Sequence, residues 1–364
     1  MKIIRFTRWL FLMCLLGGGG LACADELVAS APVLKNVQDT LQQRSPVSAL
    51  AQRSMLSAIT QAGDRLIAVG VRGHILYSDD QGQSWQQAHV PVSVTLTGVC
   101  FADRNTGWAV GHRGVILKSD DAGKSWAAQL DGIKAAQAIL EASDEKNAAS
   151  LQNARNLVTD GADKPFLDIQ CFDKDHALVV GAYGLGFSTA DGGRSWSPSL
   201  ALLDGSAQRH INVARTLGDK VYLAGEQGGL YRLSKDARDF KSLGEPYVGS
   251  FFGLVVSPQN SLLAFGLRGH LFRSTDAGGT WTRVRVDTRQ SLTAGTALVD
   301  GSILLVDESG VGWLSRDDGR SFGRVLPTQQ FPFLALQASA QGGAVAVGMN
   351  GISFFTPDTL SLSR

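Results

Sequence analysis

The sequence lacks any apolar run long enough to cross a membrane as a helix. The run at residues 9–16 is too short, and no later segment reaches about 18 apolar residues. An excess of charge is also missing, because 34 basic and 33 acidic side chains leave a net charge of +1. Without a basic excess, the chain has no global electrostatic attraction for nucleic acid. We therefore expect no membrane-spanning segment in the mature chain and no nucleic-acid partner.

Motifs of catalysis and metal binding are missing as well. There is no G-x-S-x-G elbow, no phosphate-binding P-loop and no dinucleotide-binding fingerprint. No HxH, HxxE or CxxC spacing is present, so we expect no metal and no cofactor. Glycoside hydrolysis needs two carboxylates on the binding face, and no feature of the sequence singles out such a pair. These absences favour a binding protein over an enzyme.

Residues 1–24 have the features of a secretory signal. The short apolar run is followed by Ala22-Cys23-Ala24, a small-x-small pattern that predicts cleavage near Asp25. We expect a periplasmic or extracellular protein. Lipid attachment at Cys23 is the less favoured alternative, because Gly20-Leu21-Ala22 is a poor match to the usual preceding residues. Removing the three leader cations leaves 31 basic (34 − 3) against 33 acidic side chains, a charge of −2; these cations are Lys2, Arg5 and Arg8.

Short apolar segments joined by glycine-rich turns recur along the chain. Each turn has the form G-x-x-G, and the first positions are separated by 41, 70, 44, 41, 41 and 41 residues. About 41 residues is the length of one four-stranded propeller blade. The seven turns predict an all-β fold, a seven-bladed β-propeller with one insertion in the gap of 70. They are Gly70/Gly73, Gly111/Gly114, Gly181/Gly184, Gly225/Gly228, Gly266/Gly269, Gly348/Gly351 and the variant Asp307/Gly310.

A second motif, [ST]-x-D-x-G-x-[ST]-W, follows the turns in the same phase. This is the Asp-box pattern, in which Asp accepts hydrogen bonds from nearby backbone N–H groups and Gly permits a positive φ. We expect the Trp to pack between blades as an apolar wedge. These residues are therefore interpreted as structural rather than catalytic. They are Asp80, Asp121, Asp191, Asp276 and Asp317, with Trp85, Trp126, Trp196 and Trp281.

The second repeat shows the expected layout of a blade, with strands at residues 96–101, 107–111, 115–119 and 126–130. In an up-and-down sheet, the turn between the second and third strands lies on the same face as the link to the next blade. The G-x-x-G turns are therefore expected on one face of the ring and the Asp boxes on the other.

The propeller is predicted at residues 54–358, followed by a tail at 359–364. Its last blade lacks a fourth strand of its own. Residues 25–53 are expected to contain a helix at 32–43 and, within 46–53, a strand that closes the ring.

The insertion between blades 2 and 3 comprises residues 131–164. It is rich in Ala, Gln, Asn, Glu and Lys, and we predict helices at 133–143 and 145–158. By the same face rule, this insertion rises from the G-x-x-G face.

Two cysteines remain in the predicted mature chain, Cys100 and Cys171. Each precedes a Phe in equivalent strands of consecutive repeats. Rotational pseudo-symmetry would point both thiols the same way around the ring, so that one faces away from the other. An exported protein is able to hold a disulfide, but we expect two separate buried thiols here.

The G-x-x-G turns carry the side chains best placed to bind a partner. Arg forms bidentate bonds to carboxylates, so three Arg on a common face indicate recognition of a protein. The alternative is that each Arg is a solvated turn residue paired with a local acid. The candidate partner-binding residues are Arg72, Arg113, Arg268, His112, Tyr183, Gln227 and Asn350.

The repeat unit from Gly107 to Trp126, GWAVGHRGVILKSDDAGKSW, resembles the photosystem II stability/assembly factor family. That family consists of seven-bladed propellers with Asp-box (BNR-like) repeats, and the resemblance covers about residues 54–355. It implies a non-enzymatic assembly factor of photosynthesis whose arginine patch binds membrane-protein intermediates. Arg72, Arg113 and Arg268 match the Arg position of the motif. The insertion and the other four turns depart from a uniform pattern, which leaves the identity of the partner open.

Two alternatives stay open. Sialidases share the Asp box and use three arginines, so a carbohydrate-active propeller, either hydrolase or lectin, is one of them. Their Arg-Ile-Pro motif is missing here, and seven repeats do not match their six blades. The other alternative is an accessory to an envelope transporter, which differs only in its partner. The favoured hypothesis is an exported monomer that holds a membrane or envelope complex intermediate.

Overall fold

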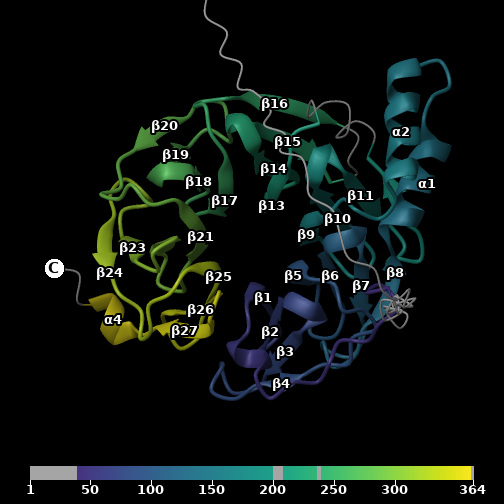
Figure 1. Ribbon diagram of the computed structural model, residues 1–364. Helices are drawn as coiled ribbons and strands as arrows, with labels where there is room; N and C mark the ends of the chain where they lie inside the picture. Colours follow the sequence, from purple (N-terminus) through teal and green to yellow (C-terminus); the bar gives the residue numbers. More distant parts are fainter. Residues whose placement is uncertain (1–38, 200–207, 236–238, 362–364) are drawn as a thin grey trace, which may run out of the picture. The chain divides into compact units, whose positions relative to one another are not determined.

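The computed structural model describes residues 39–199, 208–235 and 239–361. Within this part, seven antiparallel β-sheets stand around a common axis (Figure 1). The prediction of a seven-bladed β-propeller is confirmed. The predicted leader, residues 1–24, and most of the helix predicted at 32–43 lie outside the described residues. The described end of that helix, residues 39–43, contains a hydrogen-bonded turn instead.

Each blade is built outward from the axis in chain order. The innermost strands are β1 (Leu56–Ala62), β5 (Leu96–Phe101), β9 (Phe166–Cys171), β13 (Ile211–Leu217), β17 (Phe251–Val256), β21 (Leu292–Ala297) and β25 (Phe333–Ala338). The second strands are β2 (Arg65–Gly70), β6 (Gly107–Gly111), β10 (Ala177–Gly181), β14 (Lys220–Gly225), β18 (Leu262–Gly266), β22 (Ile303–Asp307) and β26 (Ala344–Gly348). The third strands are β3 (Ile75–Ser78), β7 (Ile116–Ser119), β11 (Gly186–Thr189), β15 (Leu230–Ser234), β19 (Leu271–Ser274), β23 (Gly312–Ser315) and β27 (Gly351–Phe355). The outer strands of blades 1–6 are β4 (Gln86–Gln87), β8 (Ala127–Leu130), β12 (Ser197–Pro198), β16 (Phe240–Gly244), β20 (Thr282–Val284) and β24 (Gly323–Val325).

The hydrophobic core lies between the sheets. Second strands such as β6 and β10 are buried along their whole length, because both of their faces pack against neighbouring blades. Strands that are buried on both faces have sequences that are continuous apolar runs rather than alternating apolar and polar residues. The periodic short apolar segments of the sequence therefore correspond to the inner layers of each blade.

Each described box Trp packs toward the preceding blade. Trp126 of blade 2 joins a cluster with Ile67 and Val69 of blade 1, and Trp85 of blade 1 packs with Val345 and Val347 of blade 7. Trp126 is only 6% exposed and meets Phe101 edge-on at 5.9 Å. The aromatic ring thus packs between two sheets that form separate ladders, and a backbone bridge between His89 and Ser125 also joins the two blades.

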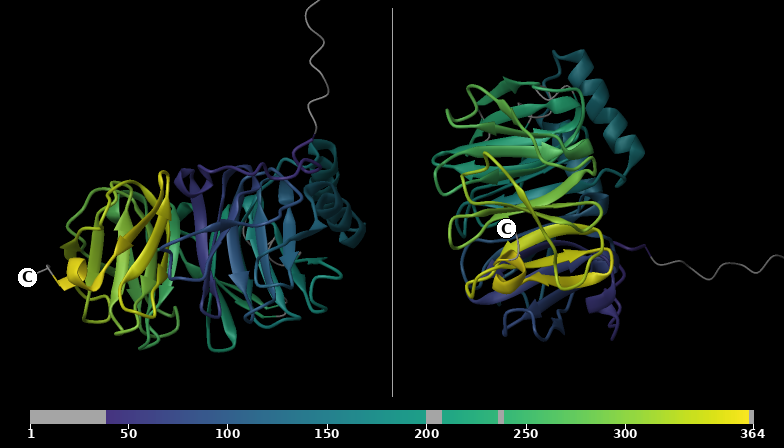
Figure 2. Two further views of the ribbon diagram at one scale, coloured as in Figure 1. Left: turned by 90° about the horizontal axis from the view of Figure 1, so that it is seen from below. Right: turned by 90° about the vertical axis from the view of Figure 1, so that its left-hand side faces the viewer.

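The insertion forms two helices, α1 (Gly132–Ala142) and α2 (Ala148–Asp160), close to the predicted bounds. Figure 2 shows them standing beside blades 2 and 3. The Asp131 carboxylate caps α1 by accepting hydrogen bonds from Ile133 and Lys134 N–H groups. Ile139 packs into the core of blades 2 and 3. No helix in the described part of the chain is long and apolar enough to cross a membrane.

The ring closes without the predicted strand. In the described part of the chain, blade 7 consists of the three strands β25, β26 and β27. The segment expected to supply a fourth strand instead ends in a 3-10 turn, η1 (Ala51–Arg53), against Gly351 at the start of β27. After β27 the chain turns into α4 (Pro357–Ser361) and buries Leu360 in the core of blades 6 and 7. Closure therefore rests on side-chain packing of blade 7 against blade 1.

The expectation of two separate thiols is wrong, because Cys100 and Cys171 form a disulfide. The two residues lie in β5 and β9, the innermost strands of blades 2 and 3. Inner strands converge toward the axis, and the two Cα atoms are 5.9 Å apart, within the range that a disulfide spans. The short distance between adjacent inner strands outweighs the orientation expected from strict rotational symmetry.

Reduction of this disulfide is expected to destabilise the propeller. The bond joins residues separated by 71 positions, and closing a loop of that length removes chain entropy worth up to about 4 kcal/mol from the unfolded state. Thermal unfolding with and without dithiothreitol measures the effect. Cys100→Ala/Cys171→Ala is expected to match the reduced protein and to be insensitive to the reductant. Equal midpoints for oxidised and reduced protein would contradict the prediction.

Candidate partner-binding face

The G-x-x-G turns are anchored to the first strand of their own blade. In every blade the backbone N–H after the first motif position donates to the carbonyl that precedes or begins the inner strand; two examples are Val71 to Met55 at 3.1 Å and His112 to Thr95 at 2.9 Å. This carbonyl lies 2.1 Å from where a Cβ on Gly70 would stand. A side chain at this position of blade 1 would therefore clash with the carbonyl, which explains the glycine there.

Five of these turns are short 3-10 turns with one residue in the left-handed region, just before the second glycine. The φ angles at this position lie between 54° and 60°, an unfavourable conformation for a residue with a side chain. The turns are η2 (Val71–Gly73), η3 (His112–Gly114), η4 (Ala182–Gly184), η5 (Glu226–Gly228) and η6 (Leu267–Gly269). The left-handed residues are Arg72, Arg113, Tyr183, Gln227 and Arg268.

In blades 6 and 7 the turn between the second and third strands has a different geometry. In blade 6, the buried Asp307 carboxylate accepts hydrogen bonds from the Ser309 and Val311 N–H groups and from the Trp313 indole. In blade 7, Met349 and Asn350 form a two-residue turn between β26 and β27. Asn350 is exposed but is not in the left-handed conformation. The seven turns therefore share a face without sharing one geometry.

The three arginines lie on the predicted face but do not form one cluster. Arg72 and Arg113 belong to neighbouring blades 1 and 2, whereas Arg268 belongs to blade 5, on the far side of the ring (Figure 1). The insertion rises from the same face, where the Arg113 carbonyl lies beside Gly132 of α1. The cationic turns thus surround the axis instead of forming a single patch.

The arginines differ in how far their charge is neutralised. Arg113 is half-buried, and its guanidinium lies 3.3 Å from the Asp39 carboxylate, as the alternative of a local ion pair requires. Arg72 and Arg268 are exposed, and neither side chain has a hydrogen bond or ion pair within the described ranges. Two of the three guanidinium groups are therefore available to an incoming carboxylate.

Two histidines next to the G-x-x-G turns, His74 and His270, pack against neighbouring side chains. His74 is buried with its Nδ1 3.1 Å from the Ser54 hydroxyl, and burial, followed by the Arg72 charge, lowers its pKa. His270 stacks on Tyr247 at 4.7 Å, and burial, followed by Arg283 and Arg268, lowers its pKa. His112 is exposed. Among the described residues, no three His, Cys, Asp or Glu side chains converge as metal ligands would.

Exposed apolar side chains gather on the same face. Ten large apolar residues are exposed in the described part of the chain, and eight of them belong to the turns or links of the G-x-x-G face. The two exceptions are Phe252 on an inner strand and Val299 in a turn of the opposite face. Exposed apolar groups rimmed by cations are typical of protein-binding surfaces. The eight residues are Val47, Leu50, Ile133, Val158, Tyr183, Val248, Leu326 and Met349.

Tyr183 occupies a distinctive place among these residues. It is 45% exposed, its ring lies 4.7 Å from the His210 ring, and the Lys164 ammonium lies 5.5 Å from the Tyr183 ring centre. Lys164 also binds Asp160 and Asp163, so its charge is locally balanced. Gln227 is exposed in the next turn. Blades 3 and 4 therefore present a neutral, aromatic and amide-bearing sector between the arginines.

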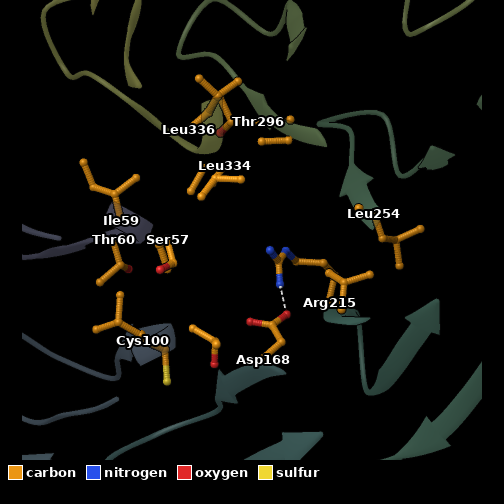
Figure 3. Close-up of a pocket in the computed structure, with 18 of the residues that line it drawn as sticks. Ser57, Ile59, Thr60, Cys100, Asp168, Arg215, Leu254, Thr296, Leu334 and Leu336 are labelled. Atoms are coloured by element: carbon orange, nitrogen blue, oxygen red, sulfur yellow. Dashed lines mark hydrogen bonds and ion pairs between the residues drawn. The ribbon is translucent and has the colours of Figure 1, made fainter. Parts of the chain in front are cut away.

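A polar channel of about 380 Å³ runs between the inner strands, and sequence reasoning did not identify it. Figure 3 shows Asp168 of β9 facing Arg215 of β13, with Arg215 Nη1 2.6 Å from the carboxylate. The Ala214 N–H also donates to Asp168, at 2.9 Å. Polar residues within otherwise apolar inner strands, such as Asp168 and Asn212, were the available signal.

The channel does not have the carboxylate pair of a glycosidase. Asp168 is the single carboxylate that lines it within the described ranges, and that group is already paired with Arg215. Acid and base roles in glycoside hydrolysis require two carboxyl groups across one bond. The sialidase-like alternative thus gains no support from this site.

The opposite face carries the Asp boxes, which form one repeated hydrogen-bond network. In blades 1, 2, 3, 5 and 6, the first Ser or Thr hydroxyl donates to Asp Oδ1 at 2.8–2.9 Å. The last Ser or Thr donates its N–H to Oδ1 at 2.8–2.9 Å and its hydroxyl to Oδ2 at 2.5–2.7 Å. Each carboxylate therefore serves its own turn.

These bonds lower the pKa of the box carboxylates. The pKa falls to about 2 at Asp80, where the Ser84 hydroxyl is the largest cause, and at Asp276, where the Thr280 N–H is. It also falls to about 2 at Asp191, mainly through the Ser195 hydroxyl. Burial raises the pKa of Asp317, but its hydrogen bonds, the strongest of them from the Ser321 hydroxyl, outweigh burial and lower that pKa to about 2.

These features define the class of protein: a seven-bladed, Asp-box β-propeller whose exposed large apolar residues lie mostly on one face. The family model for the photosynthesis system II assembly factor YCF48 matches the chain at residues 29–120 and 77–147. The resemblance found in the repeat is confirmed, and the chain is a YCF48-like propeller. Among curated proteins, no sequence matches significantly.

Solved structures agree in fold. A YCF48 bound to a D1 peptide is 15% identical, with a TM-score of 0.61 over 85% of this chain and 95% of that one. YCF48 from Cyanidioschyzon merolae is 14% identical, with a TM-score of 0.61 over 87% and 99%. The WD40 propeller domain of Doa1 is 11% identical, with a TM-score of 0.60 over 86% and 95%. At such identities the likeness shows the fold alone.

Acid is expected to destabilise the propeller through its Asp boxes. The folded-state pKa of about 2 lies below the ordinary value of 3.8, so the unfolded chain takes up protons first. The stabilisation is complete above about pH 5 and is lost as the pH falls toward 2. Thermal midpoints measured from pH 7 to pH 2 should therefore be flat above pH 5 and fall below 4.

Two variants distinguish the contribution of an Asp-box carboxylate to stability from that of an ordinary surface carboxylate. Asp121→Asn removes the acceptor of the Ser125 hydroxyl and is expected to cost about 1 kcal/mol at pH 7, because the network is partly open to solvent. The neighbouring Asp120→Asn should cost less than about 0.5 kcal/mol, because it removes only a surface ion pair with Lys118. Equal losses in the two variants would contradict the assignment.

Proposed function

We propose that this protein is an exported, non-catalytic assembly factor that holds an acidic segment of a membrane or envelope protein on its G-x-x-G face. The observation that supports this proposal best is that exposed cationic and apolar side chains occur together on that face. Eight exposed apolar residues share one side of the ring with the guanidinium groups of Arg72 and Arg268, which have no partner within the described ranges. Cations supply recognition of carboxylates, and apolar groups supply the buried area that binding needs.

The ring geometry suits an extended or broad partner. Arg72 and Arg113 stand together, the neutral sector with Tyr183 follows, and Arg268 lies across the axis. A partner that contacts all three must cover the mouth of the channel. A YCF48 of the same fold is bound to a D1 peptide, which supports a polypeptide as the ligand class.

The disulfide supports the proposal of export. Disulfides persist in oxidising compartments and are rare in the bacterial or eukaryotic cytosol. Cys100 and Cys171 are joined, and the predicted signal at residues 1–24 would direct the chain to such a compartment.

Removal of the three turn arginines is expected to lower partner recovery about tenfold or more, because cationic anchors at an interface commonly contribute more than 1 kcal/mol each. The measurement is a pull-down from solubilised membranes with Arg72→Ala/Arg113→Ala/Arg268→Ala, at low and moderate salt. The matched control, Arg104→Ala/Arg194→Ala/Arg320→Ala, removes three exposed cations from the opposite face. Unchanged recovery by the first variant, or equal loss by both, would overturn the proposed face.

Export has its own test. The secreted or periplasmic protein should begin at Asp25, which N-terminal sequencing of protein from the cell envelope determines. Lys2→Glu/Arg5→Glu/Arg8→Glu is expected to leave the precursor uncleaved, because the signal needs its positive region. Recovery of uncleaved wild-type protein from the cytosol would contradict export.

A further inference from the structure

Among the described residues, blade 7 has no outer strand, whereas every other blade has one. The outer strands of blades 1–6 comprise two to five residues, whereas the sheet of blade 7 ends at β27. The chain does not return along β27, because it leaves Phe355 for helix α4. The third strand of this blade is therefore the edge of its sheet.

Part of this edge is already covered. Phe354 donates its N–H to the Thr328 hydroxyl at 3.2 Å, and its carbonyl accepts from the Thr328 N–H at 2.8 Å. The backbone groups of Phe354 therefore point away from β26. Residues two apart in a strand point the same way, so Ile352 also directs its N–H and carbonyl outward. Neither group of Ile352 has a hydrogen-bond partner among the described residues.

A groove of about 510 Å³ lies along this edge. Ile352 and Phe354 of blade 7 and Trp85 of blade 1 line it with half-buried apolar surface. At the Asp-box end, Gly82 approaches the Phe354 ring so closely that a Cβ there would lie 3.2 Å from it. The groove occupies the place where an outer strand of blade 7 would pack against blade 1.

Charge is present at one end of the groove only. Arg53 is the single ionisable side chain among the described residues that line it; it is exposed, and no ion pair within the described ranges engages it. Arg53 and Gln52 sit beside Gly351, the first residue of β27. Because Thr328 covers the edge at Phe354, an added strand antiparallel to β27 would pair at Ile352 and run from there toward this arginine. Its C-terminal end would therefore meet a positive charge.

The neighbouring segment of the chain itself is already engaged elsewhere. The Ser45 N–H donates to the Val90 carbonyl at 3.0 Å, and the Ser48 N–H donates to the Gln87 side chain at 3.0 Å. Both bonds hold residues 45–48 against the outer side of blade 1. The described segment nearest the groove thus cannot also lie along β27.

We propose that blade 7 is completed by strand addition, in which an extended segment of a partner protein pairs with Ile352 of β27. The segment carries apolar residues at alternate positions and an acidic side chain toward its C-terminal end, where it meets Arg53. Backbone hydrogen bonds supply affinity in this mode, and the side-chain pockets supply specificity. The groove borders the G-x-x-G face at Asn350 but contains none of the three turn arginines, so either proposal can fail alone.

Labelled seven-residue peptides test the groove by fluorescence anisotropy on the full mature protein. The probe alternates Val and Thr, ends in Glu, and is acetylated and amidated so that the Glu side chain carries the only charge. We expect saturable binding that weakens at least about tenfold, or 1.4 kcal/mol, when Lys replaces Glu. A Pro at the central position should abolish binding, because it removes a ladder N–H.

Charge reversal gives the decisive comparison. Arg53→Glu should lose the Glu peptide and gain the Lys peptide, whereas Arg194→Glu, at an exposed arginine in the Asp box of blade 3, should leave both affinities within about twofold. Ile352→Pro should abolish binding by removing the outward N–H. Because Ile352→Pro is able to unfold the blade, Arg53→Glu, a surface change, is the variant on which the test depends, and its thermal midpoint is measured alongside.

Several results would overturn the proposal. Failure of the Glu peptide to bind is one, and binding that ignores both Arg53→Glu and peptide charge is another. Hydrogen exchange at the Ile352 amide is the third measurement: it should be fast in the free protein and slow with peptide. Protection in the free protein that disappears in a variant without residues 25–38 would assign the groove to this chain's own N-terminal segment. Protection that disappears on dilution would assign it to a second copy.

Discussion

The packing of each sheet against its two neighbours is the constraint on which the whole structure depends. Second strands such as β6 and β10 have no solvent-facing side, so a single blade would leave a large apolar surface uncovered. The box tryptophans and the apolar clusters that cross between blades meet this need; Trp126, for example, packs on blade 1. Because every blade requires a neighbour on both sides, the series must close into a ring.

The closed ring also places the G-x-x-G turns and the Asp boxes on opposite faces. Turns between second and third strands must lie together with the links between blades, so the G-x-x-G residues and the insertion share one face. The Asp boxes lie on the other face, where each carboxylate bonds its own turn. Asp121 and its equivalents are thus engaged in local structure, while Arg72 and Arg268 are left free within the described part of the chain. Recognition and architecture are in this way divided between the two sides.

The contacts that join neighbouring blades differ from one position in the ring to another. Between blades 2 and 3 the Cys100–Cys171 disulfide joins the inner strands at the point where the helical insertion interrupts the repeat. Between blades 7 and 1 the described residues form neither a disulfide nor an outer strand, and the contacts come from η1, Trp85 and apolar strand residues such as Leu56 and Val347. The ring is therefore covalently reinforced at one seam and open along its edge at another, and the open seam is where a partner strand has room.

The sequence by itself determined the repeat, the seven blades, the helical insertion and the assignment of turns to faces. Those features follow from local patterns: glycine where a Cβ would stand 2.1 Å from a carbonyl oxygen, Asp and Ser or Thr where a turn needs hydrogen-bond partners, and apolar runs in buried strands. What only the tertiary structure decided were contacts between residues far apart along the chain. The 5.9 Å approach of Cys100 to Cys171, the Asp168–Arg215 pair in the channel and the course of residues 46–53 depend on how inner strands converge and where the chain is diverted. No local pattern records those distances, because they are set by the packing of whole blades rather than by neighbouring residues.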